Sequence, residues 1–121
     1  RGTSREAFGK PLVKLGGNFD VIAHSRLEID SARLMVLRAA RAMDVLGNRE
    51  ARVYVSGIKA LVPEMACNVI DRAIQMHGAT GVSQWTPLAR MYTQMRTLRL
   101  ADGPDEVHRM VVARAEVAKY K

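Results

Sequence analysis

The sequence predicts an all-α protein, an antiparallel bundle of four helices. Ala, Leu, Met and Arg are abundant, whereas aromatic residues make up only 5% of the chain, and such a composition favours helices because these side chains lose little rotamer freedom there. Apolar residues recur at helical spacing, and no segment alternates as a half-buried strand would. With 121 residues, 48% of them apolar, the chain is long enough for one domain with a buried core.

The first long helix is predicted from about residue 18 to residue 46. One seam of this helix carries large apolar residues at every seventh position, and a second seam carries mostly small residues that let a partner helix approach closely. The first seam holds Ile22, Ile29, Val36 and Met43, and the second holds Ser25, Ala32, Ala39 and Leu46. Gly47-Asn48 then ends the helix, as a C-terminal glycine commonly does.

Three further helices follow in the prediction. The second runs from about residue 50 to 76 and contains Pro63, which predicts a kink or a short break because proline removes a backbone donor and crowds the preceding turn. A short helix begins at Thr86-Pro87, with Thr86 as its cap, and ends near Leu98. The last helix begins within Asp102–Glu106, where a proline and acidic residues mark a helix start. Its predicted inward face consists of Val107, Met110, Val111, Arg114 and Val117.

The chain has a formal net charge of +7 and one cysteine, Cys67. The charge is compatible with phosphate-bearing partners, but basic and acidic residues alternate as on solvated helix faces. No nucleic-acid-binding pattern accompanies it, and the apolar runs are predicted to be too short for a membrane span. A single cysteine suits a reducing compartment, and the Arg-rich composition favours a bacterial cytoplasm. Because residue 1 is Arg rather than Met, we expect the chain to begin inside a longer polypeptide.

Two glycine-containing turns are candidate ligand contacts. In the segment Arg5–Lys10, an arginine could hold a phosphate while Phe8 packs on a flat ring. A basic loop before a helix is the alternative interpretation. In the segment Gln75–Gly81, small residues after a helix let a ligand or another backbone approach closely. A simple helix-terminating turn is the alternative there.

The segment Asp102–His108 combines three carboxylates with a histidine. A helix spreads these side chains over different directions, and His108 has no histidine partner nearby, so we predict no metal site. Asp102 precedes the helix on a turn, where its carboxylate could point into a cleft and act as a base. Capping of the helix is the alternative role for the same acids.

In this order and spacing, the motifs resemble the acyl-CoA dehydrogenase family. The match runs from the Arg5–Lys10 turn through Gln75-x-x-Gly-Ala-x-Gly and Pro87-Leu88 to Val112-Ala113-Arg114-Ala115-Glu116 in the last helix. The stretch Leu98–His108 is similar to the branch of family members 10 and 11. The resemblance implies the C-terminal helical bundle of a flavoenzyme, with the N-terminal helical domain and the middle β-domain outside this chain.

The resemblance also implies an activity. The complete enzyme would oxidise an acyl-CoA thioester to the trans-2-enoyl-CoA with FAD, and an electron-transferring flavoprotein would accept the electrons. Asp102 would be the base that removes the α-proton, although it is one methylene shorter than the glutamate usual at this position. Some relatives carry their base on an earlier helix. Two further positions depart from the family, since Pro104 replaces a threonine and Gly16 replaces a glutamine that contacts the flavin.

By the same resemblance, two subunits would share each FAD, and the protein would be a homo-oligomer, either a dimer or a tetramer. The positions implied to contact FAD are Arg5, Phe8, Gln75, Gly78, Ala79 and Glu106. The chain alone is expected to fold but to bind no FAD and to be inactive. A helical interaction module without catalysis, and a basic nucleic-acid binder, are the alternative functions.

Overall fold

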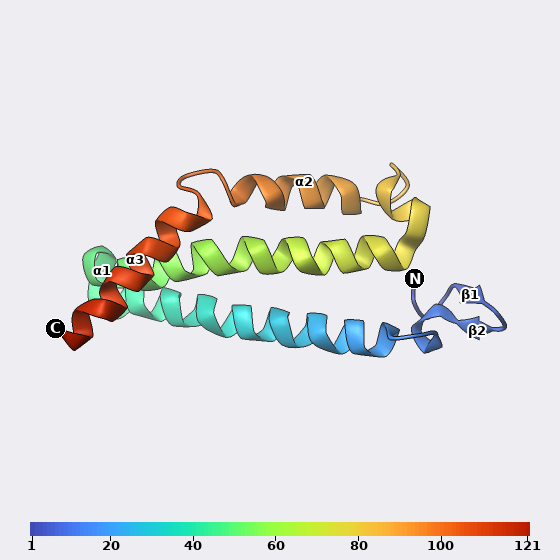
Figure 1. The fold of residues 1–121 in the computed structure, drawn as a ribbon, viewed down its shortest axis with the longest axis horizontal. Helices are drawn as coiled ribbons and strands as arrows, with labels where there is room; N and C mark the ends of the chain where they lie inside the picture. Colours follow the sequence, from blue (N-terminus) through green and yellow to red (C-terminus); the bar gives the residue numbers. More distant parts are fainter.

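The computed structural model describes all 121 residues and is mostly helical (Figure 1). Its helices are α1 (Asn18–His77), α2 (Leu88–Leu98) and α3 (Asp105–Val117). The remaining elements are a small antiparallel hairpin of β1 (Glu6–Ala7) and β2 (Lys10–Pro11) and the 3-10 turns η1 (Leu12–Lys14), η2 (Gly78–Val82) and η3 (Ala118–Tyr120). The predicted all-α class is confirmed.

Helix α1 is folded back on itself as a helical hairpin. Its backbone leaves helical geometry at one interior residue, Gly47, which has φ 76° and ψ 175°, and the chain reverses direction in this region (Figure 1). Glycine suits the position because a positive φ is strained for residues with a Cβ atom. The two limbs, residues 18–46 and 48–77, correspond to the two long helices that the sequence predicts.

The predicted break at Pro63 is wrong. Proline lies inside the second limb, yet Gly47 is the only interior residue of α1 with non-helical angles. Proline's fixed φ is itself close to the helical value, so its penalty lies in one missing hydrogen bond and in crowding of the preceding turn. The second limb lies between the first limb and α2 (Figure 1), and Pro63 is buried. Packing on both sides therefore maintains the helix despite the proline.

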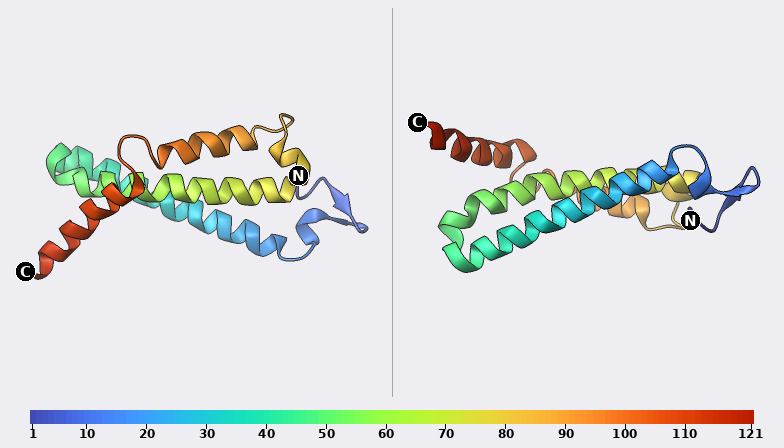
Figure 2. Two further views of the ribbon diagram at one scale, coloured as in Figure 1. Left: turned by 45° about the horizontal axis from the view of Figure 1, so that its top comes forward. Right: turned by 90° about the horizontal axis from the view of Figure 1, so that it is seen from below.

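Helix α2 runs antiparallel beside the second limb, whereas α3 turns away and projects obliquely near the Gly47 end of the hairpin (Figure 2). The β1–β2 hairpin and η2 lie together at the opposite end (Figure 1). There, Gly2 lies against Met76, because a Cβ added to Gly2 would be 3.1 Å from the Met76 sulfur. The architecture is thus a hairpin of two long helical limbs, with the shorter α2 beside it and α3 as an oblique fourth helix.

The predicted cap and the predicted inward face of the last helices need correction. The Thr86 hydroxyl donates to the carbonyls of Thr80 and Gly81 at 3.3 and 3.4 Å, and α2 has no side-chain cap. On α3, Val107, Met110 and Val117 are exposed. Arg114 is exposed as well, so Val111 is the only residue of the predicted face that is shielded from solvent. The other residues that α3 shields are Asp105, His108, Val112 and Ala115. Periodicity identified the helix, but its polar side chains contribute to the packed face.

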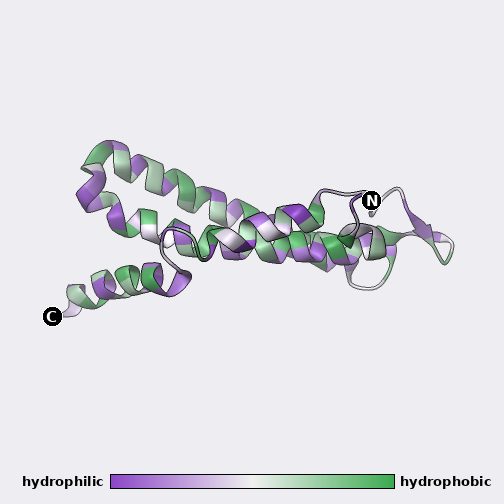
Figure 3. Ribbon diagram, turned by 90° about the horizontal axis from the view of Figure 1, so that it is seen from above, coloured by the Kyte–Doolittle hydropathy of each residue, from purple (hydrophilic) through white to green (hydrophobic).

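The core of the hairpin is made of small residues. Ala32 and Ala39 of the small-residue seam are each only 2% exposed, which confirms that this seam lies where the limbs meet. Large apolar residues of the other seam, such as Ile22 and Met43, are partly exposed, and Figure 3 shows apolar and polar residues interleaved along both limbs. The accessible surface of 8643 Å² exceeds by about a third the roughly 6,500 Å² expected of a compact monomer of this mass.

One stretch of α1 is long and apolar enough to cross a membrane by length and composition alone. The prediction that every apolar run is too short for a membrane span is therefore wrong. Core helices of soluble proteins pass the same test. A single helix of this kind is weak evidence for a membrane span.

Candidate functional site

The loop between α2 and α3 carries the predicted base in an unusual backbone conformation. Asp102 has φ 54° and Gly103 has φ 100°. The Asp102 side chain is exposed and makes no hydrogen bond or ion pair within the chain. Helix α3 has Pro104 at its N-cap and no side-chain cap. Asp102 therefore does not cap α3, and its carboxylate is free to meet a ligand.

Side chains from α1 and α3 hold this loop by its carbonyl oxygens. The Lys59 ammonium donates to the carbonyls of Leu98 at 2.6 Å and Gly103 at 3.2 Å. The His108 Nε2 atom lies 3.1 Å from the Asp102 carbonyl, and its Nδ1 atom lies 3.3 Å from the Ser56 hydroxyl. Sequence reasoning missed Lys59 and Ser56, because both lie more than forty residues from the loop.

The neighbouring acid, Asp105, belongs to an internal ion-pair network. It is 3% exposed and accepts a 2.7 Å hydrogen bond from Arg99 Nε, while its Oδ1 atom has no partner. This hydrogen bond raises the pKa of the Arg99 guanidinium. Arg109 donates to Glu64 at 2.8 Å, so the network ties α1 and α3 to Arg99, the residue that follows α2. Nearby, burial raises the pKa of the Cys67 thiol, which keeps it protonated.

The predicted Arg5–Lys10 turn is a tight β-hairpin with an exposed aromatic tip. Phe8 and Gly9 have φ values of 51° and 73°, and positive φ at both central residues characterises a type I′ turn. A left-handed conformation is strained for an aromatic residue, and Phe8 is 95% exposed. The Arg5 side chain is also exposed and has no acidic partner. Both side chains are available to a ligand from outside the chain.

The Gln75–Gly81 turn combines a packing role with an open surface. Gly78 ends α1 with φ 62° and ψ −144°, a conformation that favours glycine. A Cβ atom on Gly81 would lie 2.6 Å from the Ile74 carbonyl oxygen, so this glycine permits close backbone packing. Gln75, Gly78 and Ala79 are exposed. The helix-terminating interpretation therefore describes the backbone at Gly78 and Gly81. The candidate ligand contact describes the exposed surface of Gln75, Gly78 and Ala79.

These predicted residues fall into two groups at opposite ends of α2. The β1–β2 hairpin lies at the same end of the molecule as η2 (Figure 1). Arg5 precedes β1, Phe8 lies in the hairpin turn, Gln75 lies in the last turn of α1, and Gly78 and Ala79 belong to η2. Asp102 and the exposed Glu106 follow the other end of α2. An 11-residue helix such as α2 is about 16 Å long. A single copy of the chain does not bring the two groups into one site.

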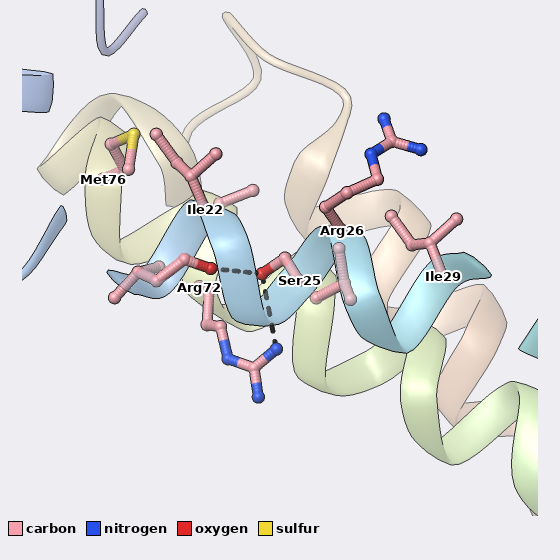
Figure 4. Close-up of a pocket in the computed structure, with 9 residues that line it drawn as sticks. Ile22, Ser25, Arg26, Ile29, Arg72 and Met76 are labelled. Carbon is pink, nitrogen blue, oxygen red and sulfur yellow. Dashed lines mark hydrogen bonds between the residues drawn. The ribbon is translucent and has the colours of Figure 1, made fainter. Parts of the chain in front are cut away.

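A groove between the two limbs holds none of the predicted residues (Figure 4). Its volume is about 260 Å³, and its lining includes Ile22, Ile29, Val69 and Met76. Arg72 donates to both carboxylate oxygens of Glu28 and, at 3.3 Å, to the Ser25 hydroxyl. The hydrogen bond from Arg72 lowers the pKa of Glu28. The polar groups of this region therefore join the limbs.

No three His, Cys, Asp or Glu side chains are grouped so that they could hold a metal ion. The three histidines lie in separate surroundings: His24 is 3.4 Å from Glu28, and His77 Nδ1 is 2.7 Å from the Ala73 carbonyl. His108, as described above, contacts the loop before α3. The ionisable chemistry of the chain thus centres on carboxylates and arginines.

Taken together, the structure defines an elongated helical-bundle domain with a free carboxylate before its last helix. Residues 2–117 match the family described as acyl-CoA dehydrogenase, C-terminal domain. The chain therefore belongs to the acyl-CoA dehydrogenase family and corresponds to its C-terminal domain.

Similar proteins agree with this assignment. "Probable acyl-CoA dehydrogenase FadE2" of Mycobacterium tuberculosis is 55% identical over 98% of this chain and 29% of its own length. "Acyl-CoA dehydrogenase family member 10" of Mus musculus is also 55% identical, over 94% of this chain and 11% of its own length, which confirms the predicted resemblance to that branch. A solved structure from Mycobacterium abscessus, assigned to the acyl-CoA dehydrogenases, has a TM-score of 0.97 and 56% identity over 99% of this chain and 30% of its own. The chain thus spans less than a third of these proteins.

Proposed function

We propose that the enzyme containing this chain is an FAD-dependent acyl-CoA dehydrogenase and that Asp102 is its base. The observation that supports the base assignment is the free carboxylate of Asp102, which lies on the turn before α3 and caps nothing. By contrast, Asp105 is buried in an ion pair with Arg99. Of these two acids, only Asp102 can accept a proton from a bound substrate without breaking the domain's internal links.

The exposed residues at the η2 end fit a flavin dinucleotide. Phe8 offers an aromatic face on a rigid turn, and Arg5 offers a guanidinium with no acidic partner in the chain. An arginine of this kind suits a diphosphate, and an exposed aromatic ring suits a flat heterocycle. Gln75, Gly78 and Ala79 provide an amide and accessible backbone beside them. At the other end of α2, Glu106 would lie near a second FAD.

The separation of the two groups along α2 supports a shared site. We propose that one copy of the chain contributes Asp102 and Glu106 while another copy contributes Arg5, Phe8 and the Gln75–Ala79 segment. The large accessible surface of the isolated domain leaves apolar side chains available for such an assembly. The assembly would be a homodimer or a homotetramer.

In the proposed reaction, a carboxylate oxygen of Asp102 accepts the α-proton of the acyl-CoA thioester. FAD, when bound, would supply the acceptor for the β-hydride. An electron-transferring flavoprotein is the proposed oxidant of the reduced flavin. Asp102 is exposed in the isolated chain, so the bound substrate and the surrounding subunits must exclude water before the carboxylate becomes an effective base. The left-handed backbone at Asp102 and Gly103 sets the direction in which the Asp102 side chain leaves the loop.

Replacement of the base tests the proposal. In the full-length enzyme, Asp102→Asn should retain FAD but lose the bleaching of the flavin absorbance by acyl-CoA, with a rate reduced by at least about 10²-fold because proton removal has no base. Asp71→Asn is the matched control, since Asp71 is an exposed acid on α1 and should leave the rate unchanged. Wild-type bleaching by Asp102→Asn would place the base elsewhere. A full-length protein without flavin absorbance would favour a non-catalytic helical module.

A further inference from the structure

The backbone that carries Asp102 needs support from its surroundings. A left-handed conformation costs a non-glycine residue about 1–2 kcal/mol, and such strain persists only where neighbouring groups hold it. Asp102 has φ 54° and is followed by Gly103 with φ 100°. The Asp102 side chain has no partner in the chain. The position of its carboxylate therefore depends on the conformation of the backbone that carries it.

Two side chains supply this support. Lys59 donates to the Gly103 carbonyl at 3.2 Å and to the Leu98 carbonyl at 2.6 Å, which joins the end of α2 to the loop. His108 Nε2 lies 3.1 Å from the Asp102 carbonyl. A carbonyl oxygen can only accept, so Nε2 must carry a proton. Two successive loop carbonyls are thus each held by a side-chain donor.

The imidazole is itself held from α1. In the neutral tautomer, Nδ1 accepts, and the Ser56 hydroxyl donates to it over 3.3 Å. Ser56 is buried, and His108 is the only partner of its hydroxyl. Ser56 and Lys59 are three residues apart on α1 and therefore share one helix face. One turn of α1 supports both loop carbonyls, directly through Lys59 and indirectly through His108.

The imidazole also fills the space beneath the loop. A Cβ atom on Gly103 would lie 2.9 Å from His108 Nε2. The ring therefore packs directly against the Gly103 backbone and donates to the carbonyl before it. A side chain at position 108 too short to reach the Asp102 carbonyl would remove both the donor and the surface on which the loop rests.

We propose that His108 and Lys59, with Ser56 holding the imidazole, are positioning residues that set the location of the Asp102 carboxylate. This inference rests on the proposed role of Asp102 as the base. Removal of the His108 link should slow α-proton removal but leave the affinity for acyl-CoA largely unchanged, because neither residue is required to touch the substrate.

Two carboxamide replacements of His108 separate its links. The amide nitrogen of Gln reaches about as far as Nε2, so His108→Gln can still donate to the Asp102 carbonyl. The amide nitrogen of Asn reaches only about as far as Nδ1, so His108→Asn retains a polar contact to Ser56 but not the loop contact. Ser56→Ala is the smaller change, since it deletes one oxygen and frees the ring from α1.

The measurement is the rate of flavin bleaching in the full-length holoenzyme, at saturating butyryl-, octanoyl- or palmitoyl-CoA, whichever bleaches the wild-type enzyme fastest. A base displaced by about 1 Å can lose roughly 10²-fold in rate, so His108→Asn should fall by about 10- to 100-fold. His108→Gln should stay within about threefold of the wild type, a change smaller than the loss of one typical hydrogen bond. Ser56→Ala should fall between them, and the dissociation constants for acyl-CoA should change by less than about threefold.

Arg109→Gln is the matched control, because Arg109 also ties α3 to α1, through Glu64, without contacting the Asp102 loop. It should keep the wild-type rate. Equal losses in His108→Gln and His108→Asn, or a wild-type rate in His108→Asn and Ser56→Ala, would overturn the positioning role. A parallel loss of acyl-CoA affinity or of bound FAD would make the role purely structural and would also overturn it.

The Asp102→Asn variant, measured alongside, separates the two proposals. If it is inactive while His108→Asn and Ser56→Ala are normal, only the positioning role is wrong. If it bleaches at the wild-type rate, or if none of the three thioesters bleaches the wild-type flavin, the proposed function of Asp102 is wrong and the positioning role is wrong with it.

Discussion

Replacement of Glu28 by glutamine should weaken the α1 hairpin by a measurable amount. Arg72 Nη1 and Nη2 each donate to a different oxygen of Glu28, across 44 positions of sequence, and the two side chains are 25% and 27% exposed. Hydrogen bonds to charged groups contribute about 1.5–3 kcal/mol, whereas fully exposed ion pairs contribute about 0.2–1 kcal/mol. For this partly shielded pair we expect Glu28→Gln to lower the free energy of unfolding by about 1.5 kcal/mol.

The effect should depend on pH in one direction. The hydrogen bond from Arg72 lowers the pKa of Glu28 in the folded chain from its ordinary value of 4.5. Near and below that pH, the unfolded chain binds more protons than the folded chain, so the stabilisation is present above the unfolded pKa and is lost as the pH falls through the folded pKa. The stability difference between wild type and Glu28→Gln should therefore be constant around neutral pH and should shrink under acid conditions.

Urea unfolding of the 121-residue chain, followed by circular dichroism from neutral pH to about pH 3, measures both effects. Asp30→Asn is the matched control, since Asp30 lies on the same limb in exposed pairs with Arg26 and Arg33 at 3.4 and 3.7 Å. It should cost less than about 0.5 kcal/mol. A Glu28→Gln cost no larger than that of the control, or a difference that persists unchanged in acid, would refute the reasoning.

Two other substitutions test the packing of the domain. Gly81→Ala would place a Cβ atom 2.6 Å from the Ile74 carbonyl oxygen, so it should destabilise the chain by about 1–3 kcal/mol in the same urea experiment; a smaller change would show that η2 can move away. Arg99→Met would leave Asp105 buried without its 2.7 Å partner and should cost about 3 kcal/mol. If Arg99→Met has the melting temperature of the wild type, Arg109, whose Nη2 is 3.9 Å from Asp105, is a sufficient partner for the Asp105 carboxylate.

Local periodicity was enough to predict the long helices. The seven-residue spacing of Ala32 and Ala39 predicted the buried seam, and Gly47 predicted the end of the first limb. Both features are determined by residues that are close together in the sequence. Pro63 shows the limit of that reasoning. Its penalty is local, but Pro63 is buried in a limb that lies between α2 and the opposite limb (Figure 1), and the sequence around Pro63 does not predict that burial.

The candidate site was predictable to the same extent. The turn carrying Asp102 and the hairpin carrying Phe8 are local structures, and the family motifs pointed to both. The links from Lys59 and Ser56 to the loop, and from Arg99 to Asp105, depend on how α3 meets α1. The same contact explains why the inward face of α3 was predicted only in part, since Asp105 and His108 share that face with Val111, whereas Val107 and Val117 are exposed.

The distribution of residue sizes connects the fold to the proposed assembly. In a self-contained bundle, the largest apolar side chains fill the interior; here alanines occupy it, while residues such as Leu27 and Leu34 are 66% and 69% exposed. Close approach of two alanine-lined limbs makes the hairpin thin, and a thin hairpin has too little interior to cover its own large side chains. In the proposed assembly, contacts with another copy of the chain would remove the remaining apolar surface from water. Those same contacts would bring the Phe8 end of one copy toward the Asp102 end of another, so burial of the outer face and completion of the proposed site would be a single event.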